Sequence, residues 1–267
     1  MDSRRQILLV LALVLLPLLT TPLFAQLILP MPDATVDQLV ALLESDVSVF
    51  EKAKACQQLA IVGDQRAVEP LSKLLADTQL STYARSALEA IPGEKVDHTL
   101  RQAATTLTGD RLVGVLHSIG KRGDVQATET LAKLLDSRDQ ATASAAARAL
   151  GYLGTPEAAG LLKAALSKTS GDSQVAMSQA CLICIQRLFA QGNKGEAVAL
   201  CDAVEDADVP AHIELAAASA AILAGGETGL ARLAVLLDSQ DDARFALVIQ
   251  LARQVVFPED LEPPGRK

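Results

Sequence analysis

The stretch GDQRAVEPLSKLL at residues 63–75 returns, without a gap, as GDVQATETLAKLL at residues 123–135, 60 residues further along the chain. Eight of the thirteen positions are identical in the two copies. A third copy lies half-way between them, so the true period is about half of that distance. A fixed period of roughly 20–50 residues is typical of stacked supersecondary units. The chain is therefore predicted to be a repeat protein. An enzymatic function is less expected for a protein of this kind.

The turn at the start of this stretch recurs at intervals of 29 to 38 residues. The turn positions are Gly63, Pro92, Gly123, Gly154, Gly192 and Gly225. The residue eight positions after each turn is always leucine, at Leu71, Leu100, Leu131, Leu162, Leu200 and Leu233. Positions eleven and twelve extend the same helical stripe. They are leucine pairs at 74–75 and 134–135, but Ala103 and Ala104 in the unit between.

A second amphipathic helix precedes each turn, and a turn glycine suits a left-handed helix C-terminus. The predicted helix pairs are 48–62 with 65–77, 80–91 with 94–107, 110–121 with 124–136, 138–152 with 156–167, 173–190 with 194–205, and 210–224 with 228–238. Helices at 34–44 and 241–256 would cap the stack. No segment shows sustained period-2 alternation. The predicted fold is all-α: a right-handed α-solenoid of six to seven antiparallel helix pairs.

The N-terminal residues have the pattern of a targeting segment. Arg4 and Arg5 precede an apolar run, and Ala25 supplies a small residue for cleavage, so residues 1–25 are expected to be a secretory signal peptide. The alternative is an uncleaved membrane anchor over residues 7–29, because a spanning helix needs roughly 20 apolar residues. The protein is therefore expected to be exported, periplasmic or secreted, or else anchored. The solenoid would occupy 34–256, and 257–267 would be a disordered tail.

Charge and aromatic content argue against one class of partner. The chain has 24 Lys and Arg against 32 Asp and Glu, with only two Tyr, five Phe and no Trp. Nucleic-acid binding needs a positive field for phosphates and rings for stacking bases. Nucleic acid is therefore excluded as a partner, and any membrane contact would come only through an uncleaved N-terminal segment.

The four cysteines are predicted to be structural. Cys181 and Cys184 have redox-motif spacing but fall mid-helix in an apolar run, so they are expected, with Cys56, to be core residues. Cys184 lies eight residues before the Gly192 turn and Cys201 nine after it, which places them level on antiparallel helices. In an oxidising compartment a disulfide between Cys184 and Cys201 stays open as an alternative.

The search for catalytic chemistry gives no candidate. His98, His117 and His212 are far apart and are expected at the surface or an edge rather than as ligands. No nucleophile motif, no phosphate-binding glycine motif and no singled-out carboxylate pair occurs. The sequence predicts no catalytic residue, no metal site and no cofactor.

The polar positions beside the leucine stripe form a ladder of mixed charge on the second helices, which are expected to line the concave side of the stack. These binding-surface candidates are Arg66, Glu69, Lys73, Gln126, Glu129, Lys133, Glu157 and Lys163. They could dock a partner, or they could simply keep this face soluble.

Two units carry a family resemblance. AVEPLSKLL at 67–75 and AAARALGYLG at 145–154 resemble HEAT repeats, most closely the short variety first associated with phycobilisome lyases. The resemblance covers 48–168 well and 173–256 loosely, and exported bacterial arrays of this kind are familiar. It implies an armadillo-like α-solenoid that binds other proteins. The di-iron hydroxylases built on such arrays use His-Glu dipeptides, and this chain has none.

The function predicted from the sequence is a non-catalytic scaffold for protein–protein interaction in the cell envelope, with a partner that the sequence does not identify. The alternative is a lyase-like or chaperone-like protein that handles a small chromophore or cofactor. That alternative would need a single deep, apolar pocket with convergent polar groups, whereas a scaffold needs a long open groove.

Overall fold

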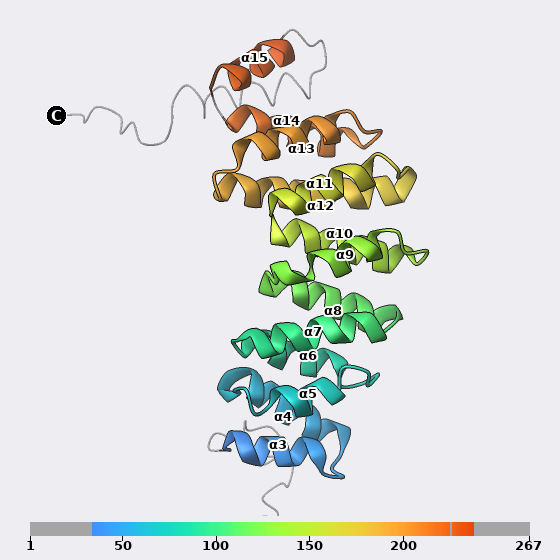
Figure 1. Cartoon of the computed structure of the whole chain (residues 1–267), viewed down its shortest axis with the longest axis vertical. Coiled ribbons are helices and arrows are strands. Elements are labelled where there is room, and N and C mark those ends of the chain that lie inside the picture. The colour runs from blue at the N-terminus through green and yellow to red at the C-terminus, as the bar shows by residue number, and fades with distance from the viewer. Residues whose placement is uncertain (1–33, 225, 238–267) are drawn as a thin grey trace, which may run out of the picture.

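The computed structural model describes residues 34–224 and 226–237, and all the regular structure in these ranges is helical. Figure 1 shows the helices layered in chain order along one long axis, from α3 at one end to α15 at the other. Each layer contacts the next along the axis. The prediction of an α-solenoid is confirmed.

The helices form two rows. The A row, which holds the first helix of each pair, contains α4 (Val49–Val62), α6 (Ser81–Ala90), α8 (Gly109–Arg122), α10 (Gln140–Leu153), α12 (Gly171–Ala190) and α14 (Ala211–Leu223). The B row contains α3 (Val36–Glu44), α5 (Val68–Lys73), α7 (Glu94–Thr106), α9 (Thr128–Leu135), α11 (Pro156–Leu166), α13 (Lys194–Glu205) and α15 (Gly226–Leu237). A short 3-10 helix, η1 (Val125–Ala127), leads into α9. Every described A-row helix contacts the next one in its row, and the B row does the same from α3 to α13.

Most helix boundaries agree with the predicted ones to within about two residues; the exceptions are α9, which begins at Thr128 after η1 and not at 124, and α5. A helix over 65–77 was expected, but α5 ends at Lys73. The amides of Leu74 and Leu75 bond to the carbonyls of Leu71 and Ser72, three residues back, at 3.1 Å each, so the last turn tightens into 3-10 geometry. The predicted helix at 241–256 and the segments 1–25 and 257–267 lie outside the described residues.

Side-chain caps fix where several helices begin. Thr35 and Ser48 form capping boxes with Gln38 and Glu51 at the starts of α3 and α4. Thr155 accepts a hydrogen bond from the amide of Ala158, ahead of Pro156 at the first position of α11. Such caps satisfy amides that have no partner within the helix. The repeat turns are therefore encoded locally as well as by the apolar pattern.

The turn glycines meet two different needs. Gly123 adopts the predicted left-handed conformation at the end of α8, with φ of 69°. Gly63 does not, because its φ is −66°. A Cβ at Gly63 would collide with the carbonyl of Leu59 and crowd Ile91. At this turn glycine serves close packing rather than a left-handed backbone. In the same turn, the carboxylate of Asp64 accepts a hydrogen bond from the amide of Arg66.

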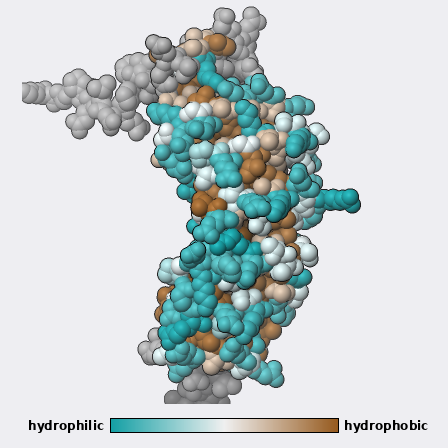
Figure 2. Space-filling view, in the orientation of Figure 1, coloured by the Kyte–Doolittle hydropathy of each residue, from teal (hydrophilic) through white to brown (hydrophobic). Residues whose placement is uncertain are grey.

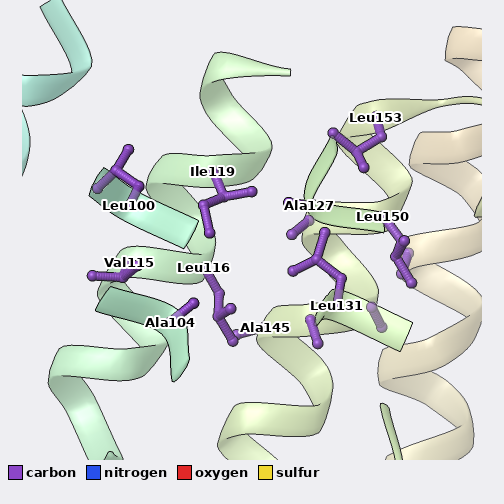
Figure 3. Packing of buried hydrophobic residues seen from close by; sticks show 14 of the residues in the cluster. Leu100, Ala104, Val115, Leu116, Ile119, Ala127, Leu131, Ala145, Leu150 and Leu153 are labelled. Atoms are coloured by element: carbon purple, nitrogen blue, oxygen red, sulfur yellow. The ribbon is translucent and has the colours of Figure 1, made fainter. Parts of the chain in front are cut away.

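The core is the seam between layers. Five of the six predicted leucine anchors are fully or almost fully buried, and Leu233 is 7% exposed. Figure 3 shows Leu100 and Ala104 of α7 beside Val115, Leu116 and Ile119 of α8. It also shows Leu131 of α9 near Ala145, Leu150 and Leu153 of α10. One continuous apolar cluster therefore runs from Val36 to Ala221.

Candidate binding surface

Two of the first three ladder residues, Arg66 in the turn before α5 and Lys73 on α5, form ion pairs with α3. Arg66 forms ion pairs with Asp37 and Asp64, each at 2.7 Å. Lys73 pairs with Glu44 at 3.3 Å. Asp37 and Glu44 each lie 29 residues before their partners, which is one repeat period. These charges link neighbouring layers, a role that the sequence analysis did not foresee.

The other ladder residues fall into two groups: some contact a neighbouring layer, and the others do not. The Gln126 amide reaches Glu94 of α7 at 3.4 Å, and the ammonium of Lys163 donates to the Ala199 carbonyl of α13 at 3.4 Å. Among the described residues, Lys133 forms an ion pair only with Glu129 on its own helix, at 2.8 Å. Glu69, with Lys73 4.0 Å away, and Glu157 are exposed. The eight candidates all belong to the B row or the turns that lead into it, and their role in binding stays a prediction.

A groove of about 640 Å³ lies between α5 and α7 on the B row. Its lining consists of eight polar and four apolar residues: Glu69, Ser72, Leu75, Ala76, Lys95, His98, Thr99, Gln102, Ala103, Thr105, Thr106 and Leu107. This volume falls within the range of roughly 300–1,000 Å³ that is usual for ligand sites. Of the eight ladder candidates only Glu69 borders it, so the groove is a site that the sequence analysis missed.

Two features of the sequence open this groove. Helix α5 is six residues long and lies beside the thirteen residues of α7, so α5 covers only part of the side of α7 that faces it. In addition, the second unit carries Ala103 at the position where the first and third carry Leu74 and Leu134. The absence of three side-chain carbons at Ala103 leaves space along α7. The alanine pair visible in the sequence was the signal that could have located the groove.

The wall of the groove formed by α7 is rich in hydrogen-bond donors. Lys95 donates only a long 3.5 Å bond to the carbonyl of Gln65. Neither Lys95 nor His98 forms an ion pair with any described residue. The Thr99 hydroxyl donates its hydrogen bond to the carbonyl of Lys95 at 2.8 Å, so this proton is not available to a ligand in the groove. The opposite wall carries Glu69, which Lys73 partly neutralises. The groove therefore presents an ammonium and an imidazole at one end.

The cysteines are free thiols in the core. Cys56, Cys181, Cys184 and Cys201 are all buried and unbonded, so the disulfide considered between Cys184 and Cys201 is not formed in this structure. Burial raises the pKa of Cys56, Cys184 and Cys201 to about 12 and raises that of Cys181 further. A thiol so rarely ionised is a poor nucleophile. These residues act as small apolar side chains, as predicted for Cys56, Cys181 and Cys184.

The histidines are dispersed over the stack. His98 lies on α7, His117 on α8 and His212 on α14. Burial and the charges of Arg148 and Arg85 lower the pKa of His117. In the part of the chain that is described, no three His, Cys, Asp or Glu side chains gather so as to hold a metal ion. None of the described helices combines the length and apolar character needed to cross a membrane.

Large exposed apolar side chains concentrate at the ends of the described stack. Val49, Phe50, Ile61 and Val62 lie on α4, and Leu223, Leu230 and Val235 lie on α14 and α15. On the face shown in Figure 2, brown apolar atoms appear in small patches among hydrophilic ones. The groove between α5 and α7 is therefore set within a largely polar surface.

Layered helix pairs with a groove along one row define an α-solenoid, a class whose extended surfaces typically bind other molecules. Residues 111–183 match the family model for HEAT repeats. This part of the chain therefore carries HEAT repeats, in agreement with the resemblance seen in the sequence. HEAT repeats generally serve as scaffolds for protein interaction and are generally non-catalytic. The finer likeness to the repeats of phycobilisome lyases stays a prediction.

No curated protein matches the chain. Among the solved structures, 47 chains match it. One is the crystal structure of an engineered protein that is 22% identical, covering 81% of this chain and 94% of that chain with a TM-score of 0.32. Such a low TM-score adds nothing to the fold assignment, which rests on the helices and their contacts.

Proposed function

We propose that this HEAT-repeat protein is a non-catalytic scaffold that binds another protein through its B row, with the groove between α5 and α7 as the main contact. The groove carries the proposal because it combines an apolar floor at Leu75 and Ala103 with a polar rim. An apolar floor excludes water from the contact, and polar groups fix the orientation of what binds. The remaining ladder residues would add weaker contacts on either side.

The alternative predicted from the sequence, a handler of a chromophore or cofactor, fits the groove less well. Such a ligand is usually held in a concave pocket lined mainly by apolar and aromatic side chains. This groove has twice as many polar as apolar lining residues, and none of them is Phe, Tyr or Trp. A polar rim over a narrow apolar floor suits a peptide chain better, because a peptide carries its own hydrogen-bonding groups.

A photo-crosslinking experiment tests the scaffold function. The full chain would carry p-benzoylphenylalanine at Gln102, which is exposed and lines the groove, or at Lys168, which is exposed and lies outside it. We expect a discrete adduct with one other protein from the Gln102 position, identified by mass spectrometry, and none from Lys168. The same adduct should disappear when Ala103→Leu fills the groove. An adduct that survives Ala103→Leu, or none at Gln102, would refute the proposal.

We further propose that the protein works outside the cytoplasm, in the cell envelope. The charged start, apolar run and small residue within residues 1–25 support this placement. Mass spectrometry of the N-terminus from fractionated cells is the test. A chain beginning at Gln26 in the extracytoplasmic fraction supports export. An intact N-terminus in the membrane pellet would favour the anchor at residues 7–29, and an intact N-terminus in the cytosol would contradict both.

A further inference from the structure

The chemistry of the groove between α5 and α7 also restricts its occupant. We infer that it binds an extended segment of the partner in which an aspartate or glutamate side chain and an apolar side chain lie about four residues apart. This inference rests on the proposed scaffold function. It follows from the length of the groove and from the separation of its charged and apolar ends.

The length of the groove suits a short extended peptide. Its lining on α7 runs from Lys95 to Thr106 and ends at Leu107. At 1.5 Å per residue this part of the helix spans about 18 Å. An extended chain advances about 3.3 Å per residue, so five to six residues would fill the groove.

The acidic side chain would bind at the start of α7. Lys95 and His98 are three residues apart in a helix, so both face the groove and a single carboxylate can reach both. The nearest acidic group in the lining, Glu69, belongs to the other wall and lies 4.0 Å from Lys73. Among the described residues no carboxylate pairs with Lys95. Since the one acceptor of Lys95 there is the carbonyl of Gln65 at 3.5 Å, a partner carboxylate would supply a negatively charged acceptor.

The apolar side chain would bind at the other end of α7. Leu75, Ala103 and Leu107 supply the apolar lining there, and Ala103 leaves the space that a leucine fills in neighbouring units. The middle of the apolar end lies about 13 Å along the helix from the middle of the Lys95–His98 pair. That distance corresponds to about four residues of extended chain, and side chains four apart in a strand point to the same side.

The occupant is expected to be an internal segment rather than a chain end. A scaffold contact that continues along the B row needs partner chain on both sides of the groove. The carboxylate is therefore assigned to an Asp or Glu side chain. A free terminal carboxylate offers the same chemistry to Lys95, so the experiment must separate the two sources.

Selection from two random nine-residue peptide libraries tests this inference on the full chain. In the first library both peptide ends are fused to carrier sequence, and in the second the C-terminus is free. We expect the first library to yield peptides with Asp or Glu four residues from Leu, Ile, Val or Phe. Changing that acid to its amide should weaken binding about tenfold, the loss expected for a hydrogen-bonded charge. Enrichment only in the free-terminus library would overturn the inference.

A charge reversal supplies the matched control. Lys95→Glu should weaken the selected acidic peptide at least tenfold, and repeated selection on this variant should yield Lys or Arg at the same position. Lys168→Glu changes the net charge equally outside the groove and should leave affinity within twofold. A structural role for Lys95 would not produce a switch of preference. If Lys95→Glu binds the acidic peptide as the wild type does, the inference is wrong.

Blocking the groove separates this inference from the function on which it rests. Ala103→Leu and Ala76→Trp obstruct it from opposite walls, and unchanged circular dichroism would show that both variants fold. The selected peptides could lose binding to both variants and yet contain no Asp or Glu. This result would overturn the inference but leave the scaffold function intact, because the groove would still be the binding site. Selected peptides that bind both variants as tightly as the wild type would have to bind outside the groove. This result would also overturn the inference. The crosslink from Gln102 then decides the scaffold function by itself.

Discussion

The seam between α6 and α8 and the seam between α10 and α12 each contain a glycine that faces the neighbouring helix, yet they are held together differently. A Cβ at Gly114 of α8 would lie 2.6 Å from the guanidinium of Arg85, which occupies the space. A Cβ at Gly151 of α10 would lie 2.6 Å from the backbone carbonyl of Ala180 in α12. One glycine makes room for a charged side chain, and the other lets two backbones approach.

The two seams also differ in the polar contacts between their helices. In the α6–α8 seam, Ser118 donates to Glu89 at 2.7 Å and Lys121 pairs with Glu89 at the same distance. The guanidinium of Arg122 donates to the carbonyls of Leu88, Glu89 and Ile91 at the end of α6. Within 128–190, all of it described, no side chain–side chain hydrogen bond or ion pair links two helices. One repeat architecture therefore tolerates both a charged and an apolar seam.

The largest expected effect tests whether seams act independently. Leu131 is fully buried on α9, and Leu131→Ala should cost about 2–5 kcal/mol of unfolding free energy through lost contacts and the cavity left behind. Because each layer contacts only its neighbours, hydrogen exchange should speed up mainly from α8 to α11. Equal loosening across all described helices would mean that the two seams cannot be treated separately.

The charged seam should depend on a single arginine. Arg122 holds Asp97 at 2.5 Å and closes the C-terminus of α6, so Arg122→Leu leaves several acceptors without a donor. We expect a loss of about 1.5–3 kcal/mol in a denaturation experiment. Arg187→Leu on α12 is the control, because Arg187 forms no side-chain hydrogen bond with a described residue. The substitution also keeps the Cβ and Cγ of residue 187, which occupy the space that a Cβ at Gly154 would need. Similar losses for the two variants would contradict the contrast between the seams.

The two glycines should respond unequally to alanine. Both variants gain about 1 kcal/mol of helix propensity. Gly151→Ala must also force α12 away, an overpacking cost of about 1–3 kcal/mol. At Gly114 the obstacle is the flexible end of Arg85, which can shift. Thermal unfolding should show Gly151→Ala less stable than Gly114→Ala, and the reverse order would break the comparison.

The smallest expected effect is a difference in acid sensitivity. Burial raises the pKa of Glu89, but hydrogen bonds from Lys121 and Ser118 and the charges of Lys121 and Arg85 lower it more, so the net shift from 4.5 is downward. A carboxyl with a lowered pKa stabilises the fold above its unfolded pKa, and that stability is lost as the pH falls through the folded value. Exchange protection of α6 and α8 should therefore fall on acidification before that of α10 and α12. Glu89→Gln should remove this difference.

The repeat pattern sufficed to predict the fold because it repeats the same local rule. Leucine eight residues after each turn predicted anchors that are buried, and the turn spacing located most helix ends. It failed for α5, where the 3-10 turns after Lys73 leave no mark in the apolar periodicity. It also did not reveal that Arg66 and Lys73 form ion pairs with residues of α3. Opposite charges 29 residues apart, one period, were the signal that would have paired Arg66 with Asp37.

The sequence contains a signal for the position of the groove, but it does not determine the shape of the groove. The substitution of alanine at Ala103 marks the unit that lacks volume, yet a cavity also needs the short neighbour α5. How close Lys95 and His98 come to an acidic neighbour depends on side-chain packing across two layers. Side-chain spacing along one helix cannot supply that information.

The four buried cysteines can report the local opening of the helices that carry them. At a pKa of about 12 a thiol reacts with an alkylating reagent only after its helix opens to solvent. Cys56 lies on α4, whereas Cys181 and Cys184 lie on α12, which forms one side of the apolar seam, and Cys201 lies on the following helix, α13. Native-state labelling followed by peptide mapping would therefore time the opening of α4 and of α12 and α13 separately, in the wild-type chain and without any engineered cysteine.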